Sequence, residues 1–252
     1  MPIAVTERVA SAAVIDIDSV AVMPMKHQLT QWLPVGPAVL VLLSAGAGAT
    51  DALVFTELGK VFASILTGNL VLLGAAVGLS GIELMPPFTV LAAYLVGVAV
   101  AARWCRAMPP GMRRTARIRH CLAGEATLVV VVAVIALVAD AIGAVRIVLL
   151  AVAALAMGVQ SAAVLVIDRG SPTTYMTSTF TGLVSDLAAE RRADPLAVAR
   201  IAAVVLGATA AVALYSASAH WGFVIPAALI ASAVTLAYTR SWRDVAQPML
   251  DE

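Results

Sequence analysis

Long apolar stretches separated by short polar breaks run through most of the chain. A transmembrane helix needs about 20 mainly apolar residues to cross a hydrocarbon core about 30 Å thick. On this basis we predict membrane-spanning helices at residues 33–55, 86–105, 121–139, 146–167, 198–216 and 221–238. The predicted fold class is an all-α integral membrane protein with about six transmembrane helices.

Two other segments interrupt this pattern, and we predict that they are broken or re-entrant helices. Residues 61–79 are apolar but follow a polar break at Glu57 and Lys60, and residues 171–189 are rich in threonine and serine. Irregular backbone at membrane depth is tolerated only where protein or water surrounds it. We therefore expect protein to enclose the second segment, which is too polar for lipid contact.

The distribution of arginine favours six spans over eight. Cytoplasmic loops of membrane proteins are enriched in arginine and lysine, and the most basic loop covers residues 103–120. If that loop is cytoplasmic, a model with eight spans places five other arginines outside the cell, whereas a model with six spans places them in the cytoplasm. These are Arg191, Arg192, Arg200, Arg240 and Arg243. We predict six spans with both termini in the cytoplasm, and we expect the basic loop to contact anionic lipids.

A shift of 110 positions relates the two halves of the chain. It places Thr67-Gly68-Asn69 on Thr177-Ser178-Thr179 and Gly48 on Gly158. Three spans in each half would give the halves opposite orientations, which is the inverted-repeat design of many secondary transporters. The predicted organisation is an N-terminal tail (1–32), a first membrane repeat (33–142), a second membrane repeat (143–239) and a C-terminal tail (240–252).

Composition agrees with a membrane protein. Hydrophobic residues make up 62% of the chain and charged residues 12%, against about 45–50% and about 25% in ordinary soluble proteins. Lipid must therefore cover much of the surface. The formal net charge of +1 argues against nucleic acid as a partner. Acidic residues interrupt the apolar run within the first thirty residues, so we do not predict a cleaved signal peptide.

Signatures of enzymes and cofactor sites are missing from the sequence. The histidines at 27, 120 and 220 are scattered and suggest neither a metal cluster nor a catalytic triad, and no phosphate-binding glycine loop is present. Cys105 and Cys121 lack the CxxC spacing of metal or redox sites and are predicted to be free thiols. We expect no enzymatic activity, no catalytic residue, no metal and no cofactor.

Asp51 is the sharpest candidate for a functional residue. An ionisable side chain within a span costs about 2.5–3.5 kcal/mol on insertion scales, and it normally faces the protein interior or a water path. Helical spacing places Ser44, Gly48 and Asp51 on one face. Asp51 could bind an ion or solute on that face, or it could lie near the outer end of its helix and cap the segment that follows.

Hydroxyl and amide side chains complete the candidate substrate or ion site. Broken helices expose backbone groups that, together with such side chains, can coordinate a small polar solute, although interhelical hydrogen bonds would satisfy the same groups without a ligand. We expect Gly74 and Gly78, by contrast, to allow close helix packing. The candidate site consists of Asp51, Thr50, Thr67, Asn69, Gln160, Ser161, Thr177 and Thr179.

Four short motifs carry a family resemblance. Residues 45–52 read Ala-Gly-Ala-Gly-Ala-Thr-Asp-Ala, and residues 66–74 read Leu-Thr-Gly-Asn-Leu-Val-Leu-Leu-Gly. In the second half, residues 156–162 read Ala-Met-Gly-Val-Gln-Ser-Ala, and residues 172–179 read Pro-Thr-Thr-Tyr-Met-Thr-Ser-Thr. These motifs resemble those of the YoaK-like family of bacterial multipass membrane proteins, also known as domain of unknown function 1275, over about residues 33–238.

The resemblance implies a bacterial inner-membrane protein with about six spans, and it does not supply a function. Three positions depart from the family motifs: Leu66 stands where methionine is common, Ser161 where asparagine is common, and Ser178 where glycine is common. The serine at 161 weakens any role that needs an amide at that position.

Two functions are compatible with these features. The first is a secondary transporter or permease for a small solute, with Asp51 and the two Thr-led segments forming a site near the middle of the membrane. The alternative is a non-transporting membrane scaffold, or a lipid- or partner-binding protein, in which the repeat is purely architectural. Expected partners are membrane lipids and, for a transporter, a small solute or a coupling ion.

Overall fold

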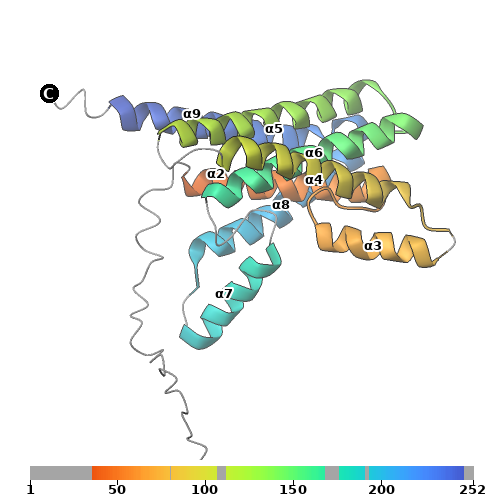
Figure 1. Cartoon of the computed structure of the whole chain (residues 1–252), viewed down its shortest axis with the longest axis horizontal. Helices are drawn as coiled ribbons and strands as arrows, with labels where there is room; N and C mark the ends of the chain where they lie inside the picture. The colour runs from red at the N-terminus through yellow and green to blue at the C-terminus, as the bar shows by residue number, and fades with distance from the viewer. Residues whose placement is uncertain (1–35, 80, 107–111, 168–175, 191–192, 247–252) are drawn as a thin grey trace, which may run out of the picture. The chain divides into compact units, whose positions relative to one another are not determined.

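Helices account for the secondary structure of the residues that this computed structural model describes: 36–79, 81–106, 112–167, 176–190 and 193–246. Pro37 and Pro195 each stand in the first turn of a helix, where the missing N–H is not needed. The helices drawn in Figure 1 are α2 (Pro37–Leu53), α3 (Leu66–Gly78), α4 (Met85–Arg106), α5 (Met112–Val138), α6 (Gly143–Ile167), α7 (Met176–Glu190), α8 (Pro195–Ala217) and α9 (Val224–Ala246).

Six helical segments in the described part of the chain are long and apolar enough to cross a membrane: Pro37–Gly59, Met85–Cys105, Ala116–Val138, Gly143–Val166, Pro195–Ala217 and Ala219–Thr239. This agrees with the predicted all-α fold and its six apolar spans. The last span includes the 3-10 turn η4 (Ala219–Trp221) that precedes α9. The architecture is that of a multi-pass membrane protein.

The first span ends later than predicted because its helix does not stop at the polar break. A π-helical turn, η3 (Val54–Gly59), continues α2 to Gly59. Within that turn the carboxylate of Glu57 accepts a hydrogen bond from the hydroxyl of Tyr215 on α8. This bond gives the acid a protein partner, so the polar residue can remain inside the helical segment.

Helix α3 is too short to span. Its 13 residues rise about 20 Å at 1.5 Å per residue, which is less than the hydrocarbon thickness of a bilayer. Its apolar side chains are largely uncovered by protein, with Val71 72% and Val77 77% exposed. The prediction of close packing at Gly74 and Gly78 is wrong, because a Cβ atom at either position would meet no atom within 4 Å.

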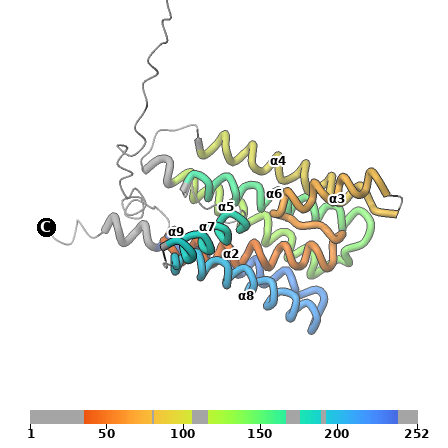
Figure 2. The backbone as a smooth tube through the Cα atoms, turned by 90° about the horizontal axis from the view of Figure 1, so that it is seen from below, coloured from red at the N-terminus to blue at the C-terminus, as the bar shows by residue number. Residues whose placement is uncertain are grey.

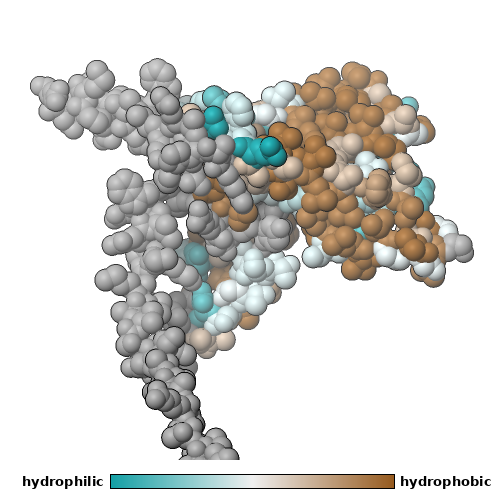
Figure 3. Space-filling view, in the orientation of Figure 1, coloured by the Kyte–Doolittle hydropathy of each residue, from teal (hydrophilic) through white to brown (hydrophobic). Residues whose placement is uncertain are grey.

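The most extensive helix contacts join the first half of the chain to the second. Helix α2 packs along α8, α4 packs along α6, and α5 lies against both α6 and α9. Figures 1 and 2 show these long helices as one bundle, with α3 on its flank beside α4. The space-filling view in Figure 3 shows that apolar side chains cover most of the visible face of the bundle, as expected for a surface in contact with lipid.

Two glycines bring α2 and α8 into backbone contact. A Cβ atom at Gly48 would lie 2.3 Å from the carbonyl oxygen of Val204, and one at Gly207 would lie 2.1 Å from the carbonyl oxygen of Ala45. Neither position has room for a side chain. Small residues at such crossings let transmembrane helices approach closely and gain dispersion contacts.

The crossing of α4 and α6 repeats this arrangement. A Cβ atom at Gly97 would lie 2.2 Å from the carbonyl oxygen of Leu155, and one at Gly158 would lie 2.2 Å from that of Tyr94. Gly158 and Leu155 lie 110 positions after Gly48 and Ala45. Gly97 and Tyr94 lie 110 positions before Gly207 and Val204. The two crossings are therefore built from corresponding residues with the roles of the two halves exchanged.

Candidate functional site

The chain reverses direction after the first span and returns along it. Gly59 and Lys60 have positive φ angles of 150° and 57°, and the left-handed conformation of Lys60 ends the helical segment. Residues 61–65 then lead back to the start of α3, as the loop in Figure 2 shows. Two side chains, Asp51 and Asn69, hold residues 61–65 in place, and we call this segment the returning loop.

Asp51 holds the returning loop through both of its carboxylate oxygens. Oδ1 accepts a hydrogen bond from the backbone N–H of Ser64 at 2.8 Å, and Oδ2 accepts one from the Ser64 hydroxyl at 2.5 Å. Asp51 lies eight residues before the end of its span, which is about 12 Å along a helix. Since Ser64 comes back to this level, α3 begins at the depth of Asp51 rather than at the end of the span.

Asn69 closes the same loop from the other side. Its amide oxygen accepts a hydrogen bond from the N–H of Phe62 at 3.0 Å, and its amide nitrogen donates to the carbonyl of Phe62 at 2.5 Å. The Phe62 ring stacks on Phe55 with centroids 5.0 Å apart. The two side chains that we predicted to bind a ligand therefore satisfy backbone groups, as the capping alternative for Asp51 required, while their neighbour Thr67 is exposed.

Gln160 and Ser161 connect α6 to two other helices. The amide of Gln160 donates to the carbonyl of Leu43 on α2 at 3.4 Å. The hydroxyl of Ser161 accepts a hydrogen bond from Tyr94 of α4 at 2.6 Å and donates to the carbonyl of Met157 at 2.8 Å. Both side chains are buried, so α6 carries the polar centre of the bundle.

A buried arginine joins α8 to α2. Arg200 is 2% exposed, and its Nε donates to the hydroxyl of Ser44 on α2 at 3.4 Å. Helix α8 begins at Pro195, three residues before the predicted start of this span at residue 198, so Arg200 lies within its second turn. The capping of α8 explains the early start, since the carboxylate of Asp194 accepts a hydrogen bond from the N–H of Leu196 at 2.9 Å.

We call these five side chains from four helices the core polar cluster: Ser44, Tyr94, Gln160, Ser161 and Arg200. They place hydroxyl, amide and guanidinium groups inside an apolar bundle, where hydrogen bonds join α4 to α6, α6 to α2 and α8 to α2. Such groups can bind a small polar or anionic solute through hydrogen bonds and charge. Only Gln160 and Ser161 were among the predicted site residues.

The other predicted residues lie apart from the core polar cluster. The Thr50 hydroxyl donates to the carbonyl of Gly46 within its own helix at 2.8 Å. On α7, Thr177 is exposed, whereas Thr179 is buried and its hydroxyl has no hydrogen-bond partner among the described residues. The expectation that protein encloses this segment is not met within residues 176–189, where Phe180 is 56% exposed. The rest of the predicted segment, residues 171–175, lies outside the described residues.

Glu125 is a buried acid that we did not predict to be functional. It lies on α5, is 0% exposed, and neither carboxyl oxygen has a hydrogen-bond partner among the residues the structure describes. Its signal in the sequence was a single acid inside a predicted span, which is the same signal that identified Asp51. The two acids differ in their partners. The carboxylate of Asp51 accepts hydrogen bonds from Ser64, whereas that of Glu125 accepts none among the described residues.

The two cysteines meet between α4 and α5. Cys105 and Cys121 are free and buried, and their sulfur atoms are 2.7 Å apart. Their sequence spacing predicted free thiols and gave no sign of this contact. Cys121 lies one helical turn from Glu125, so this part of α5 combines sulfur and carboxyl groups.

Comparison with known proteins gives a family match. Residues 39–237 match the family described as "Protein of unknown function (DUF1275)", which covers all six apolar spans almost entirely. No curated protein and no solved structure matches the chain.

Proposed function

The chain belongs to the DUF1275 family, and we propose that it is a secondary transporter or permease for a small solute. The observation that carries this proposal is the core polar cluster, whose hydrogen bonds join α4 to α6, α6 to α2 and α8 to α2. Polar and ionisable side chains inside a membrane bundle are costly, and they normally mark a path or site for a solute or ion.

The proposal includes an inverted repeat, with the first half running from residue 33 to 142 and the second from 143 to 239. The corresponding glycine crossings of α2 with α8 and of α4 with α6 support it. So do the three candidate spans in each half, because an odd number of spans reverses the orientation of the second half. Transporters of this design bind solutes at the interface between their repeats.

In this scheme the core polar cluster binds the solute. Gln160 and Ser44 supply hydrogen-bonding groups, and the Arg200 guanidinium supplies a positive charge that favours an anionic group on the solute. The loop held by Asp51 and Asn69 has a different role. It is a structural element, since Asp51 and Asn69 are bonded to Ser64 and Phe62 rather than free to bind a solute.

The proposal is tested by uptake of labelled solutes into liposomes that contain the purified chain. The panel consists of carboxylates, sugars, amino acids and inorganic anions. We expect solutes of one class to enter liposomes that contain the chain faster than they enter protein-free liposomes. We expect Gln160→Leu and Arg200→Met to abolish that uptake. Thr67→Val is the matched control, because Thr67 is exposed on α3. Equal uptake by the wild type and by protein-free liposomes for every class would contradict transport.

A second function, a non-transporting scaffold or lipid-binding protein, is favoured by one observation. The glycine crossings bring backbones into contact with no space for a side chain, which suits a rigid bundle better than one that rocks between two states. Identical helix-to-helix cross-linking patterns with and without every solute in the panel would support this alternative.

A further inference from the structure

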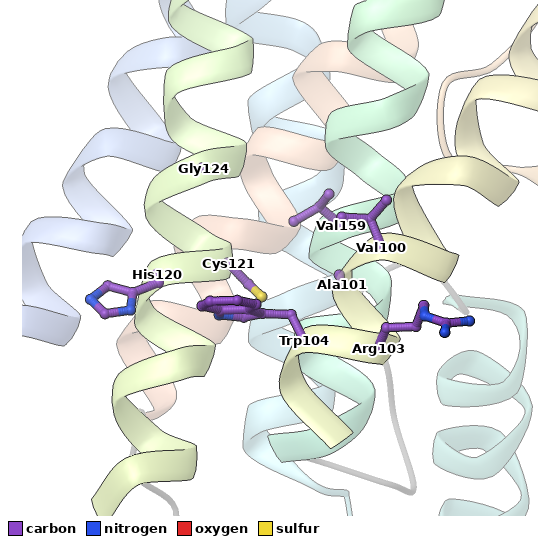
Figure 4. A pocket seen from close by; sticks show the side chains of 8 residues that line it. All are labelled: Val100, Ala101, Arg103, Trp104, His120, Cys121, Gly124 and Val159. Atoms are coloured by element: carbon purple, nitrogen blue, oxygen red, sulfur yellow. The ribbon is translucent and has the colours of Figure 1, made fainter. Parts of the chain in front are cut away.

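A groove opens between α4 and α5 beside Trp104. Its volume is about 530 Å³, and Val100, Ala101, Gly124 and Val159 give it apolar walls. Figure 4 shows Val100 and Val159 directed toward this space from α4 and α6, with the Trp104 ring beside Cys121. The groove therefore has the volume and the apolar lining to accept a hydrocarbon chain.

Gly124 keeps the groove open. A Cβ atom at this position would meet no atom within 4 Å, so the glycine is not required for helix packing. Its missing side chain leaves space between the outer faces of α4 and α5. At the glycines of the two helix crossings, by contrast, the backbone of a neighbouring helix occupies the space that a side chain would need.

Basic residues lie at the groove. Arg103 and His120 line it and extend to opposite sides in Figure 4. The guanidinium of Arg117 lies over the Trp104 ring at 4.8 Å from its centroid and donates to the Trp104 carbonyl at 3.0 Å. No acidic side chain lines the groove within the described residues, so the charge at the groove is positive.

We propose that this groove binds one anionic glycerophospholipid, with an acyl chain along Gly124 and the phosphate beside Arg103 and Arg117. Charge complementarity selects the occupant, because basic pockets between transmembrane helices favour anionic headgroups. Trp104 supports the placement, since indole rings prefer the headgroup level of a bilayer. The proposal is independent of whether the chain transports a solute.

The test measures Trp104 fluorescence in vesicles of phosphatidylcholine. Phosphatidylglycerol brominated along its acyl chains is compared with brominated phosphatidylcholine at the same mole fraction, because bromine quenches only nearby tryptophan. Trp104→Phe gives the signal of the other tryptophans, and subtraction isolates Trp104. We expect the anionic lipid to be preferred by at least about fivefold at this site, because each arginine near a membrane surface contributes about 1 kcal/mol, which is about fivefold.

Three variants separate the two parts of the site. Arg103→Gln and Arg117→Gln should each lower the preference while quenching by both lipids persists. Gly124→Leu should reduce quenching by both lipids, because it fills the groove, whereas Gly74→Leu on α3 should change neither. Equal quenching of wild-type Trp104 by the two lipids would overturn the proposal. A preference that survives in the Arg103→Gln, Arg117→Gln double variant would also overturn it.

Discussion

The amide and the hydroxyl of Ser64 both donate to the carboxylate of Asp51, 13 residues earlier in the chain, at 2.8 Å and 2.5 Å. This pair fixes the point at which the returning loop ends and α3 begins. Hydrogen bonds to charged groups contribute about 1.5–3 kcal/mol, and both side chains are buried in the protein. The stability of the loop should therefore depend on the pair.

We predict that Ser64→Ala and Asp51→Asn each destabilise the protein by about 1.5–3 kcal/mol. The double variant should cost less than the sum of the two, because both changes remove the same interaction. Thermal unfolding of the four proteins in detergent gives the coupling energy. Thr67→Val should change stability by less than about 0.5 kcal/mol, and additive effects of the first two substitutions would refute the pairing.

The glycine crossings lead to a second prediction. Gly158→Ala places a Cβ atom against the carbonyl of Tyr94 and should destabilise the bundle by about 1–3 kcal/mol through overpacking. Gly48→Ala should have a similar effect, since it occupies the corresponding place in the other crossing. Gly74→Ala has open space and should stabilise α3 by up to about 1 kcal/mol. Unfolding midpoints of the three variants in one detergent test the ranking.

Glu125 leads to a third prediction. A buried polar group without a partner costs about 1–3 kcal/mol, so Glu125→Met, which keeps the size of the side chain, should raise the unfolding midpoint. Glu125→Gln still buries an unpaired polar group and should recover little of this stability. If Glu125→Met lowers the midpoint, the carboxyl has a stabilising partner in the membrane-embedded protein.

The returning loop leads to a fourth prediction about sidedness. Because α3 starts at the depth of Asp51, Lys60 and Glu83 should lie on the same side of the membrane, with Asp194 on the opposite side. Cysteines placed at these three positions in a background with Cys105 and Cys121 replaced by serine can be tested with a membrane-impermeant maleimide. Labelling of positions 60 and 83 from opposite sides would mean that the intervening segment crosses the membrane.

The helices could be predicted from sequence because lipid imposes a simple rule, namely that apolar runs of sufficient length are helical. The same rule failed at helix ends that depend on tertiary contacts. Glu57 marked the predicted end of the first span, yet Tyr215 accommodates it inside the helix. The span predicted to begin at residue 198 begins at Pro195, where the carboxylate of Asp194 caps α8.

The candidate site was harder to predict because residue type does not reveal a partner. Asp51 and Asn69 were predicted to bind a ligand, and in the structure their side chains bond to Ser64 and Phe62. Neither partner is recognisable in the sequence, since the bonds use mainly backbone groups. The glycines illustrate the same limit: Gly74 and Gly78 have the spacing of a packing motif, and only the fold decides which glycines meet another helix.

The exchange of roles between the two crossings has a consequence for how the chain can be divided. The closest backbone contacts join residues before the turn at 139–142 to residues after it, since α2 meets α8 and α4 meets α6. In either fragment alone, the helix faces that carry these glycines have no partner helix. The other fragment supplies the helices that pack against them. Two fragments separated at Asp140 and produced in one cell should therefore assemble into the intact bundle, and two antiparallel copies of a single half would offer one another the same complementary surfaces.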